Sequence, residues 1–66
     1  EGNVFKGNIV SFKSSNNWAI TEKSNIGIVG HDNIAVVEYN NQILVINLSD
    51  SESVRKIIDK LEKINN

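Results

Sequence analysis

The stretch GHDNIAVVEYNNQILVINL (residues 30–48), followed at once by SDSESVRKIIDKLEK (residues 49–63), decides the fold prediction. Residues 34–39 and 42–48 are rich in Ile and Val, which favours two β-strands. Asn40 and Asn41 between them tolerate the positive φ angles that a type I′ hairpin turn requires. Both runs are apolar at successive positions, so we expect both faces of the hairpin to be covered.

An amphipathic helix is predicted after the hairpin. Apolar residues recur at helical spacing on one stripe, with charged residues on the other side; the stripe consists of Val54, Ile57, Ile58, Leu61 and Ile64. Ser49 with Glu52 fits a capping box and Ser51 is a rival cap, and the sequence leaves both open. The stripe either covers the hairpin or docks on a partner, or its inner residues do the first and its flanking residues the second, and we expect the internal role first.

The first half of the chain predicts several short strands, at residues 3–5, 7–13, 18–21 and 25–30. Polar clusters at residues 14–17 and 22–24 separate them and predict loops. Gly27 lies inside a strand pattern, which predicts a bulge or a close backbone approach. No repeat of fixed period is detected, although short strands with polar corners suit a small coil-like β arrangement.

Composition limits the chain to one small domain. A chain of 66 residues buries only ~60% of the surface that its unfolded form exposes. It has no cysteine and one histidine, so neither a disulfide framework nor a zinc cluster can stabilise it. We therefore expect a partner surface to do so. The chain opens at Glu1 without Met and without a signal-peptide pattern, and we interpret it as a fragment of a longer protein.

The charge balance excludes some classes of function. Seven basic and eight acidic residues give a net charge of −1, whereas nucleic-acid binders normally carry a basic excess on one face. No apolar run approaches the ~20 residues that a transmembrane helix needs. We expect a protein that binds neither nucleic acid nor membrane and that is cytoplasmic.

The sequence contains no recognisable catalytic constellation. The glycines, at positions 2, 7, 27 and 30, form no phosphate-binding loop. His31 lacks an orienting carboxylate on its own face and is interpreted as a solvent-facing turn residue. The candidate carboxylates are Asp32, Glu38, Asp50 and Glu52. Their spacing predicts no paired acid and base, so we favour structural roles, with Glu38 facing outward or guarding a sheet edge. We assign no catalytic, cofactor-binding or metal-binding residue.

Four aromatic residues remain, Phe5, Phe12, Trp18 and Tyr39. They could form a stacking platform for single-stranded nucleic acid. Because the basic groove that such a platform needs is missing, we expect them in the core or at an interface instead.

From about Gly7 to Leu61 the residue order closely resembles the carboxy-terminal module of bacterial mannose-1-phosphate guanylyltransferases of the type II, bifunctional family. The matching residues are Ile26, Gly30, Asp32, Asn33, Ile34, Val36, Val37, Glu38, Ile43, Leu44, Val45, Val54, Arg55, Lys56, Ile57, Ile58 and Leu61. The chain departs from the family where it has Trp18 for a smaller residue, Asn25 for Leu, Gly27 for Ala, His31 for an aliphatic residue, and Gln42 and Ile46 for Ala.

This resemblance implies that residues 1–66 are a carboxy-terminal accessory domain, mainly β with one carboxy-terminal α-helix, and a small left-handed β-helix-like module. In the family this module packs on the catalytic domain and takes part in dimer contacts. The parent enzyme makes GDP-mannose and pyrophosphate from mannose 1-phosphate and GTP with Mg²⁺. Nothing here matches the family's G-G-x-G-x-R-L nucleotide loop, so the resemblance implies an active site elsewhere. The alternative is a free-standing β adaptor that binds a protein partner by strand addition.

Overall fold

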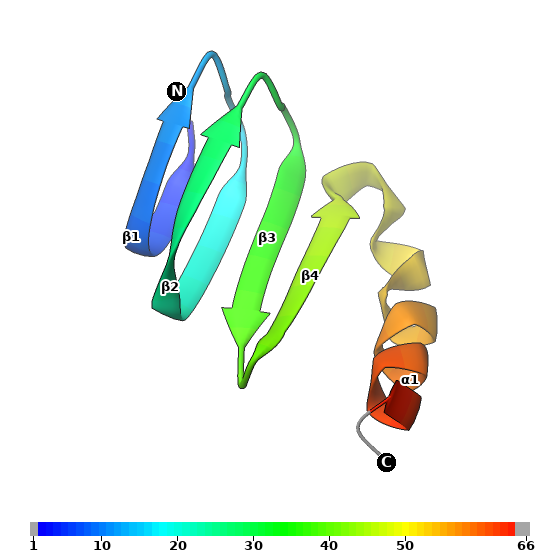
Figure 1. Ribbon diagram of the computed structural model, residues 1–66. Helices are drawn as coiled ribbons and strands as arrows, with labels where there is room; N and C mark the ends of the chain where they lie inside the picture. The colour runs from blue at the N-terminus through cyan, green and yellow to red at the C-terminus, as the bar shows by residue number, and fades with distance from the viewer. Residues whose placement is uncertain (1, 65–66) are drawn as a thin grey trace.

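The computed structural model describes residues 2–64, apart from the side chain of Ser51, and contains one mixed β-sheet (Figure 1). The strands, which lie in sequence order across the sheet, are β1 (Val4–Phe12), β2 (Trp18–Val29), β3 (Ile34–Tyr39) and β4 (Gln42–Asn47). A 3-10 segment, η1 (Leu48–Ser53), leads into helix α1 (Val54–Ile64). β1, β2 and β3 are parallel, whereas β3 and β4 are antiparallel. The described chain is therefore mainly β with one α-helix at its carboxy-terminal side, as predicted.

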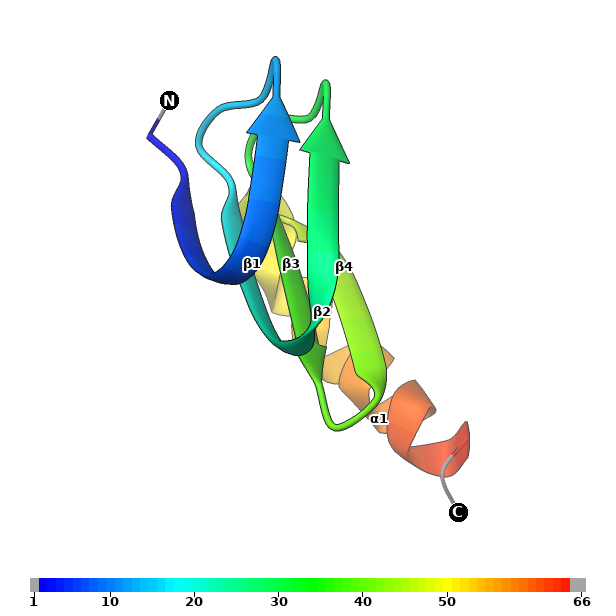
Figure 2. The ribbon, with the colours of Figure 1, turned by 60° about the vertical axis from the view of Figure 1, so that its left-hand side comes forward.

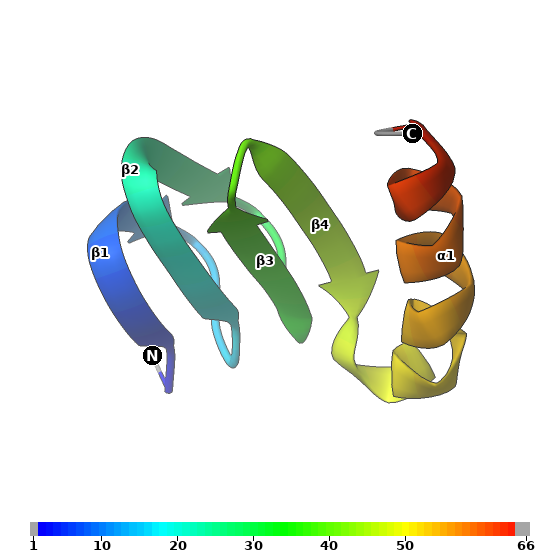
Figure 3. The same cartoon turned by 90° about the horizontal axis from the view of Figure 1, so that it is seen from below.

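β1 and β2 are bent strands with two arms each (Figures 2 and 3). Residues 4–6 pair with residues 18–20, and residues 8–12 pair with residues 25–29. The short strands predicted on either side of residues 22–24 are thus the two arms of one strand. Two successive turns of the chain stack in parallel register, and β3 adds to the first arms only.

The bend in β1 depends on a glycine. Gly7 has a φ of 111°, and a Cβ at this position would lie 2.6 Å from the backbone oxygen of Thr21. Only glycine fits so tight a corner with this backbone conformation. At Gly27, by contrast, an added Cβ would meet no atom within 4 Å. The predicted bulge or close backbone approach at Gly27 is not seen among the described residues, and the register shift lies at Gly7 instead.

The core lies between the arms of the bent strands. Its buried side chains are small or medium in size, and partly buried residues pack against them. The buried set is Ala19, Ile28 and Val36, and the partly buried set is Phe5, Ile9, Ile26 and Ile34. A core this small leaves little stability to spare, which is expected for a chain of this length.

The predicted hairpin is confirmed, with φ angles of 53° at Asn40 and 64° at Asn41. The two strands of the hairpin differ in how far their side chains are buried. Val36 of β3 is buried, whereas Ile43 and Val45 of β4 are exposed. The prediction that both faces are covered is therefore wrong for β4.

Helix α1 lies beside β4, at the end of the molecule far from β1 (Figures 1 and 3). Val54 and Leu61 are half-buried, but no described residue of the helix is buried. The apolar stripe therefore covers the hairpin only in part: Ile57 lines a hollow with Val45 and Ile46 of β4, and Ile57 and Ile58 are still exposed. Within residues 2–64 no helix has the length and apolar character needed to cross a membrane.

The α-helix begins later than the capping box predicted. Ser49 lies within η1, and α1 begins only at Val54, after η1 has ended. The Ser49 hydroxyl donates instead to Asn47 Oδ1 at 3.0 Å. The rival cap, Ser51, lies outside the described side chains.

Candidate functional site

The carboxylate of Glu38 is buried, with 5% of the residue exposed. Its Oε1 accepts hydrogen bonds from the Thr21 hydroxyl (2.8 Å) and from the backbone N–H groups of Glu22 (2.9 Å) and Lys23 (3.1 Å). Glu38 stands opposite Thr21 in the parallel register, where the corner of β2 turns its N–H groups inward. The prediction of an outward-facing residue or an edge guard is therefore wrong.

These donors hold the pKa of Glu38 below its ordinary value of 4.5. The N–H group of Lys23 contributes most, followed by the Thr21 hydroxyl and the Glu22 N–H, while burial acts in the opposite direction. Hydrogen bonds that favour the charged form lower a carboxyl pKa in this way. Glu38 is thus an anion at neutral pH that stabilises its own corner rather than a group poised to exchange protons.

Two asparagines fix equivalent corners in successive turns. Asn17, which is fully buried, donates from Nδ2 to the carbonyl of His31 (2.8 Å) and accepts at Oδ1 from the N–H of Ile34 (3.0 Å). Asn3 repeats the pattern one turn earlier: its Nδ2 donates to the carbonyl of Ser14 (3.2 Å), and its Oδ1 accepts from the N–H of Asn17 (2.9 Å). Each asparagine therefore replaces backbone pairing where the chain changes direction.

The corners belong to a structural repeat that the sequence analysis missed. Gly2, Asn16 and Asn33 have φ angles of 75°, 58° and 62° and stand at equivalent positions, separated by 14 and then 17 residues. Lys13 (55°) and Gly30 (71°) are likewise 17 residues apart. The sequence signal for this repeat was an Asn or Gly shortly before the first arm of each strand. The spacing is irregular because the corner between the two arms contains one residue in β1, Gly7, whereas the equivalent corner in β2 contains residues 21–24.

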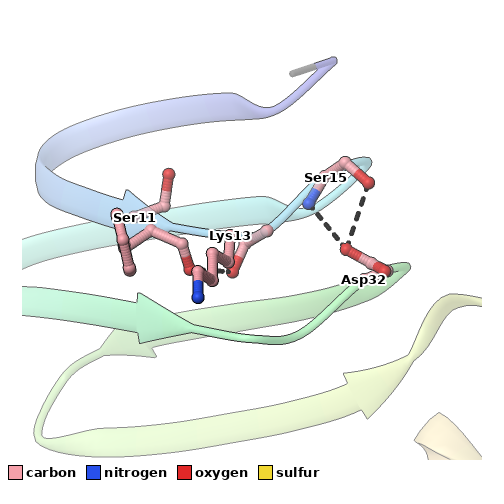
Figure 4. Close-up of a pocket in the computed structure, with 6 residues that line it drawn as sticks. Ser11, Lys13, Ser15 and Asp32 are labelled. Atoms are coloured by element: carbon pink, nitrogen blue, oxygen red, sulfur yellow. Dashed lines mark hydrogen bonds between the residues drawn. The ribbon is translucent and has the colours of Figure 1, made fainter.

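A polar hollow lies at the corner between β1 and β2 (Figure 4), lined by Ser11, Phe12, Lys13, Ser14, Ser15 and Asp32. Asp32 Oδ1 accepts from the N–H (2.8 Å) and the hydroxyl (3.1 Å) of Ser15. The Ser14 hydroxyl donates to the carbonyl of Phe12 (3.1 Å) and accepts from the N–H of His31 (3.2 Å). His31 is exposed, as predicted. The polar groups around the hollow thus cross-link adjacent turns of the chain.

The remaining candidate carboxylates lie apart from these corners. Asp50 and Glu52 are exposed in η1, and Asp50 Oδ1 accepts from the Ser53 hydroxyl at 3.0 Å. In the part of the chain that the structure describes, no three His, Cys, Asp or Glu side chains gather closely enough to hold a metal ion. Asp32 and Glu38 lie in separate parts of the fold from each other and from η1, which carries both Asp50 and Glu52.

Apolar surface is the main feature that a partner could recognise. Phe12, Trp18 and Tyr39 are exposed, and only Phe5 packs against the core. Of the aromatic residues, Phe5 alone is half-buried against the core, and an interface role for the others stays a prediction. The other exposed large apolar residues are Val4, Val10, Ile20, Val29, Ile43, Val45, Leu48, Ile57, Ile58 and Ile64.

Comparison with known proteins gives a consistent set of relatives, although no family model matches the sequence. Mannose-1-phosphate guanylyltransferase of Salmonella muenchen is 34% identical over 64 residues, which cover 97% of this chain. Mannose-1-phosphate guanylyltransferase 2 of Escherichia coli O157:H7 is 30% identical over 61 residues, which cover 92% of this chain. The chain spans 13% of the length of each of these relatives.

The fold has also been seen in a solved structure. The crystal structure of mannose-1-phosphate geranyltransferase from Thermus thermophilus matches with a TM-score of 0.69 and 22% sequence identity. The match covers 91% of this chain and 18% of that chain. The arrangement of bent strands, hairpin and helix is therefore similar to one part of a much longer polypeptide.

Proposed function

Because the chain belongs to the mannose-1-phosphate guanylyltransferase family, through relatives that match almost all of it, we propose that residues 1–66 form a non-catalytic accessory domain of such an enzyme. One observation carries the proposal. The same matches cover 92–97% of the length of this chain but only 13% of the length of the relatives. We assign the domain to the carboxy-terminal side of a separate catalytic domain.

The whole enzyme would join mannose 1-phosphate to GTP, giving GDP-mannose and pyrophosphate, in the cytoplasm. A divalent cation such as Mg²⁺ would neutralise the phosphates during this transfer. The described residues do not suit that ion, because their carboxylates are dispersed and Glu38 is engaged by backbone N–H groups. We therefore assign the Mg²⁺ and both substrates to the catalytic domain.

The hydrogen bonding of the polar side chains supports a non-catalytic role. Glu38, Asp32 and Asn17 direct their oxygens at N–H or hydroxyl groups of this same chain. A catalytic acid, base or nucleophile must instead reach a bound substrate. The polar groups of this domain are arranged to hold its corners, which fits a scaffold.

We further infer that the bent strands are turns of a short left-handed β-helix. The parallel register of β1, β2 and the first part of β3 supports a coiled path, as do the equivalent corners at Asn16 and Asn33. In such a coil each turn needs a residue tolerant of positive φ at its corner, and Asn is among the few that suit it.

The partners of the domain would be its own catalytic domain and a second copy of the enzyme. Exposed apolar side chains on β4 and α1, such as Val45 and Ile57, support assembly, because such surface is seldom left uncovered in soluble monomers. An 11-residue helix with no buried residue is also marginally stable without further packing.

The test is a comparison of the complete natural polypeptide with a version lacking residues 1–66. GDP-mannose formation, oligomeric state and thermal unfolding would be measured for both. We expect the truncated enzyme to retain chemistry per folded molecule while losing stability and assembly. The full-length variant His31→Ala should keep the wild-type kcat. A fold-preserving change at His31 or Asp32 that abolished kcat would show that this domain supplies a catalytic group.

One observation favours the alternative, a free-standing adaptor that binds by strand addition. β1 (VFKGNIVSF) is an edge strand with no described segment along its outer edge (Figure 1), and such edges readily pair with another strand. An adaptor of this kind would bind an extended peptide as a monomer. The complete polypeptide would then show no guanylyltransferase activity.

A further inference from the structure

The polar hollow at the corner between β1 and β2 (Figure 4) contains polar groups that the corner itself does not use. Asp32 receives both of its described hydrogen bonds at Oδ1, from the N–H and the hydroxyl of Ser15. Its Oδ2 has no described partner. The Ser11 hydroxyl accepts from Asn3 Nδ2 at 3.5 Å, and its own proton has no described acceptor. These groups are therefore open to a ligand.

Lys13 occupies its corner at a cost to the backbone. Its φ is 55°, in the left-handed region that residues with a Cβ rarely adopt. At the equivalent corner one turn later stands Gly30, with a φ of 71°, which avoids that cost. Strained positions of this kind are concentrated at functional sites, including ligand clamps. Lysine is thus the costlier residue at this corner, which points to a role for its side chain.

The Lys13 ammonium and the Asp32 carboxylate line the hollow from adjacent turns of the chain. The two side chains stand apart in Figure 4 and form no ion pair, and the ammonium lies 5.4 Å from the centre of the Phe12 ring. One positive and one negative group leave the hollow without net charge. Asp32 would repel a lone anion and Lys13 would repel a lone cation. A simple ion is therefore a poor ligand for this hollow.

A neutral ligand that both donates and accepts hydrogen bonds suits the hollow better. Lys13 and Ser11 offer donors, and Asp32 Oδ2 and the Ser15 oxygen offer acceptors. A sugar hydroxyl serves either kind of partner, because it has one proton and two lone pairs. Phe12, which is 63% exposed, adds an apolar surface for the C–H groups of a sugar ring. The volume of the hollow is about 610 Å³, within the roughly 300–1,000 Å³ of small-molecule sites.

We propose that this hollow binds a neutral hexopyranoside between Lys13 and Asp32. Lys13 donates to one hydroxyl group of the sugar, and Asp32 Oδ2 accepts from another. Because the residues that line the hollow are exposed or half-buried, the affinity for a monosaccharide is expected in the millimolar range. The site is separate from the nucleotidyl transfer proposed for the whole enzyme and does not depend on it.

The test is saturation-transfer NMR of the complete natural polypeptide with the methyl glycosides of mannose, glucose and galactose. A polypeptide lacking residues 1–66 supplies the background from any other sugar site. We expect at least one glycoside to give a saturable signal in the complete polypeptide that is missing from the truncated one. Equal signals from the two polypeptides would overturn the proposal.

Lys13→Gly separates the site from the fold, because glycine suits the φ of 55° at this position. It should raise the Kd of the glycoside about tenfold or more, while the thermal midpoint stays the same or rises. Lys13→Arg keeps the charge and the donor and should hold the Kd within about threefold of the wild-type value. The matched control is Lys6→Met, at another exposed lysine of β1, which should leave the Kd unchanged. Unchanged binding in Lys13→Gly would overturn the proposal.

Asp32→Asn tests the other side of the hollow. Asparagine keeps an oxygen for the bonds from Ser15 and replaces the free acceptor by an amide donor. The Kd of the glycoside should rise about tenfold. Inorganic phosphate should begin to bind, because Lys13 is then unopposed. Phosphate that displaced the glycoside from the wild type would identify an anion site and overturn the proposal.

Discussion

The two ends of this molecule are held together by different forces. At the β1–β3 end, polar side chains bind backbone groups of the next turn, as Asn17 does at His31 and Ile34. At the β4–α1 end, the side-chain hydrogen bonds are local, as from Ser49 to Asn47 and from Ser53 to Asp50, and the apolar residues Val45 and Ile57 are left exposed. The bent strands therefore hold their shape through hydrogen bonds within the chain. The stability of the hairpin and helix depends instead on a further surface that covers their apolar side chains.

The physical reason lies in how each region turns. Tight corners leave backbone N–H and carbonyl groups without strand partners, and buried groups of that kind must be paired. Asn3, Asn17 and Glu38 supply those partners within the chain. Outside its first and last turns, α1 pairs its backbone groups internally, so the helix chiefly needs apolar burial, which another surface can provide.

The largest effect is expected at Gly7. In Gly7→Val, the new Cβ would lie 2.6 Å from the Thr21 oxygen at a φ of 111°. We expect a loss of about 3–4 kcal/mol in the free energy of unfolding, since steric overlap and backbone strain add. Urea denaturation measures it. Gly27→Val is the matched control and should cost far less, because the space above Gly27 is open.

If both glycine variants lost equal stability, the corner at Gly7 would not be the constraint that the geometry indicates. That outcome would remove the main argument for a coil whose shape is set by its corners. A loss confined to Gly7→Val would instead separate strain at a corner from strand propensity, because both variants place the same side chain in a strand.

Asparagine removal should have the next largest effect. Asn17→Ala leaves the carbonyl of His31 and the N–H of Ile34 unpaired at a fully buried position, which should cost about 2–3 kcal/mol. Asn3→Ala removes the equivalent bonds from a half-buried position that water can reach, and should cost about 1 kcal/mol. Denaturation of the two variants in parallel gives the comparison. Equal losses would contradict the role assigned to burial.

Much of the hairpin and helix could be predicted from sequence, because their signals are local. Asn40-Asn41 between two apolar runs specifies a turn, and apolar residues at helical spacing specify a helix. The role of Glu38 could not be predicted. It depends on N–H groups of Glu22 and Lys23, which are 16 and 15 residues away in sequence.

The sequence analysis missed both the repeated corners of the strands and the exposure of the apolar stripe on α1, for related reasons. The turns differ in length at Gly7, so no fixed period marks Asn16 and Asn33 as equivalent. The apolar stripe of α1 predicts burial but not by which surface, since periodicity reports an apolar face and not its partner. The absence of a catalytic constellation in residues 1–66 was inferred from residue types and spacing and remains a prediction.

The pH dependence of stability should report on Glu38. Its pKa is lower in the folded chain than its ordinary value of 4.5. The stability that it contributes is therefore complete above pH 4.5 and is lost as the pH falls below 4.5 and through the lower pKa of the folded state. Glu38→Gln keeps the size of the side chain and removes this titration. Unfolding between pH 7 and pH 3 should show the wild-type advantage shrinking on acidification, and a constant difference would contradict the assignment.

The smallest effect is expected in α1. Ile58→Gln replaces an exposed apolar residue of a helix without buried positions, so the free energy of unfolding of the 66-residue chain should change by no more than about 0.5 kcal/mol. In the complete polypeptide the same substitution should cost more if a second copy or another domain covers the helix.

Hydrogen exchange of the α1 amides, measured in the 66-residue chain and in the complete polypeptide, gives the comparison. Fast exchange in the short chain and protection in the long one would show that the hairpin–helix end is completed from outside. A large loss in the short chain would instead show that α1 already packs on β4, and the contrast between the two ends would no longer hold.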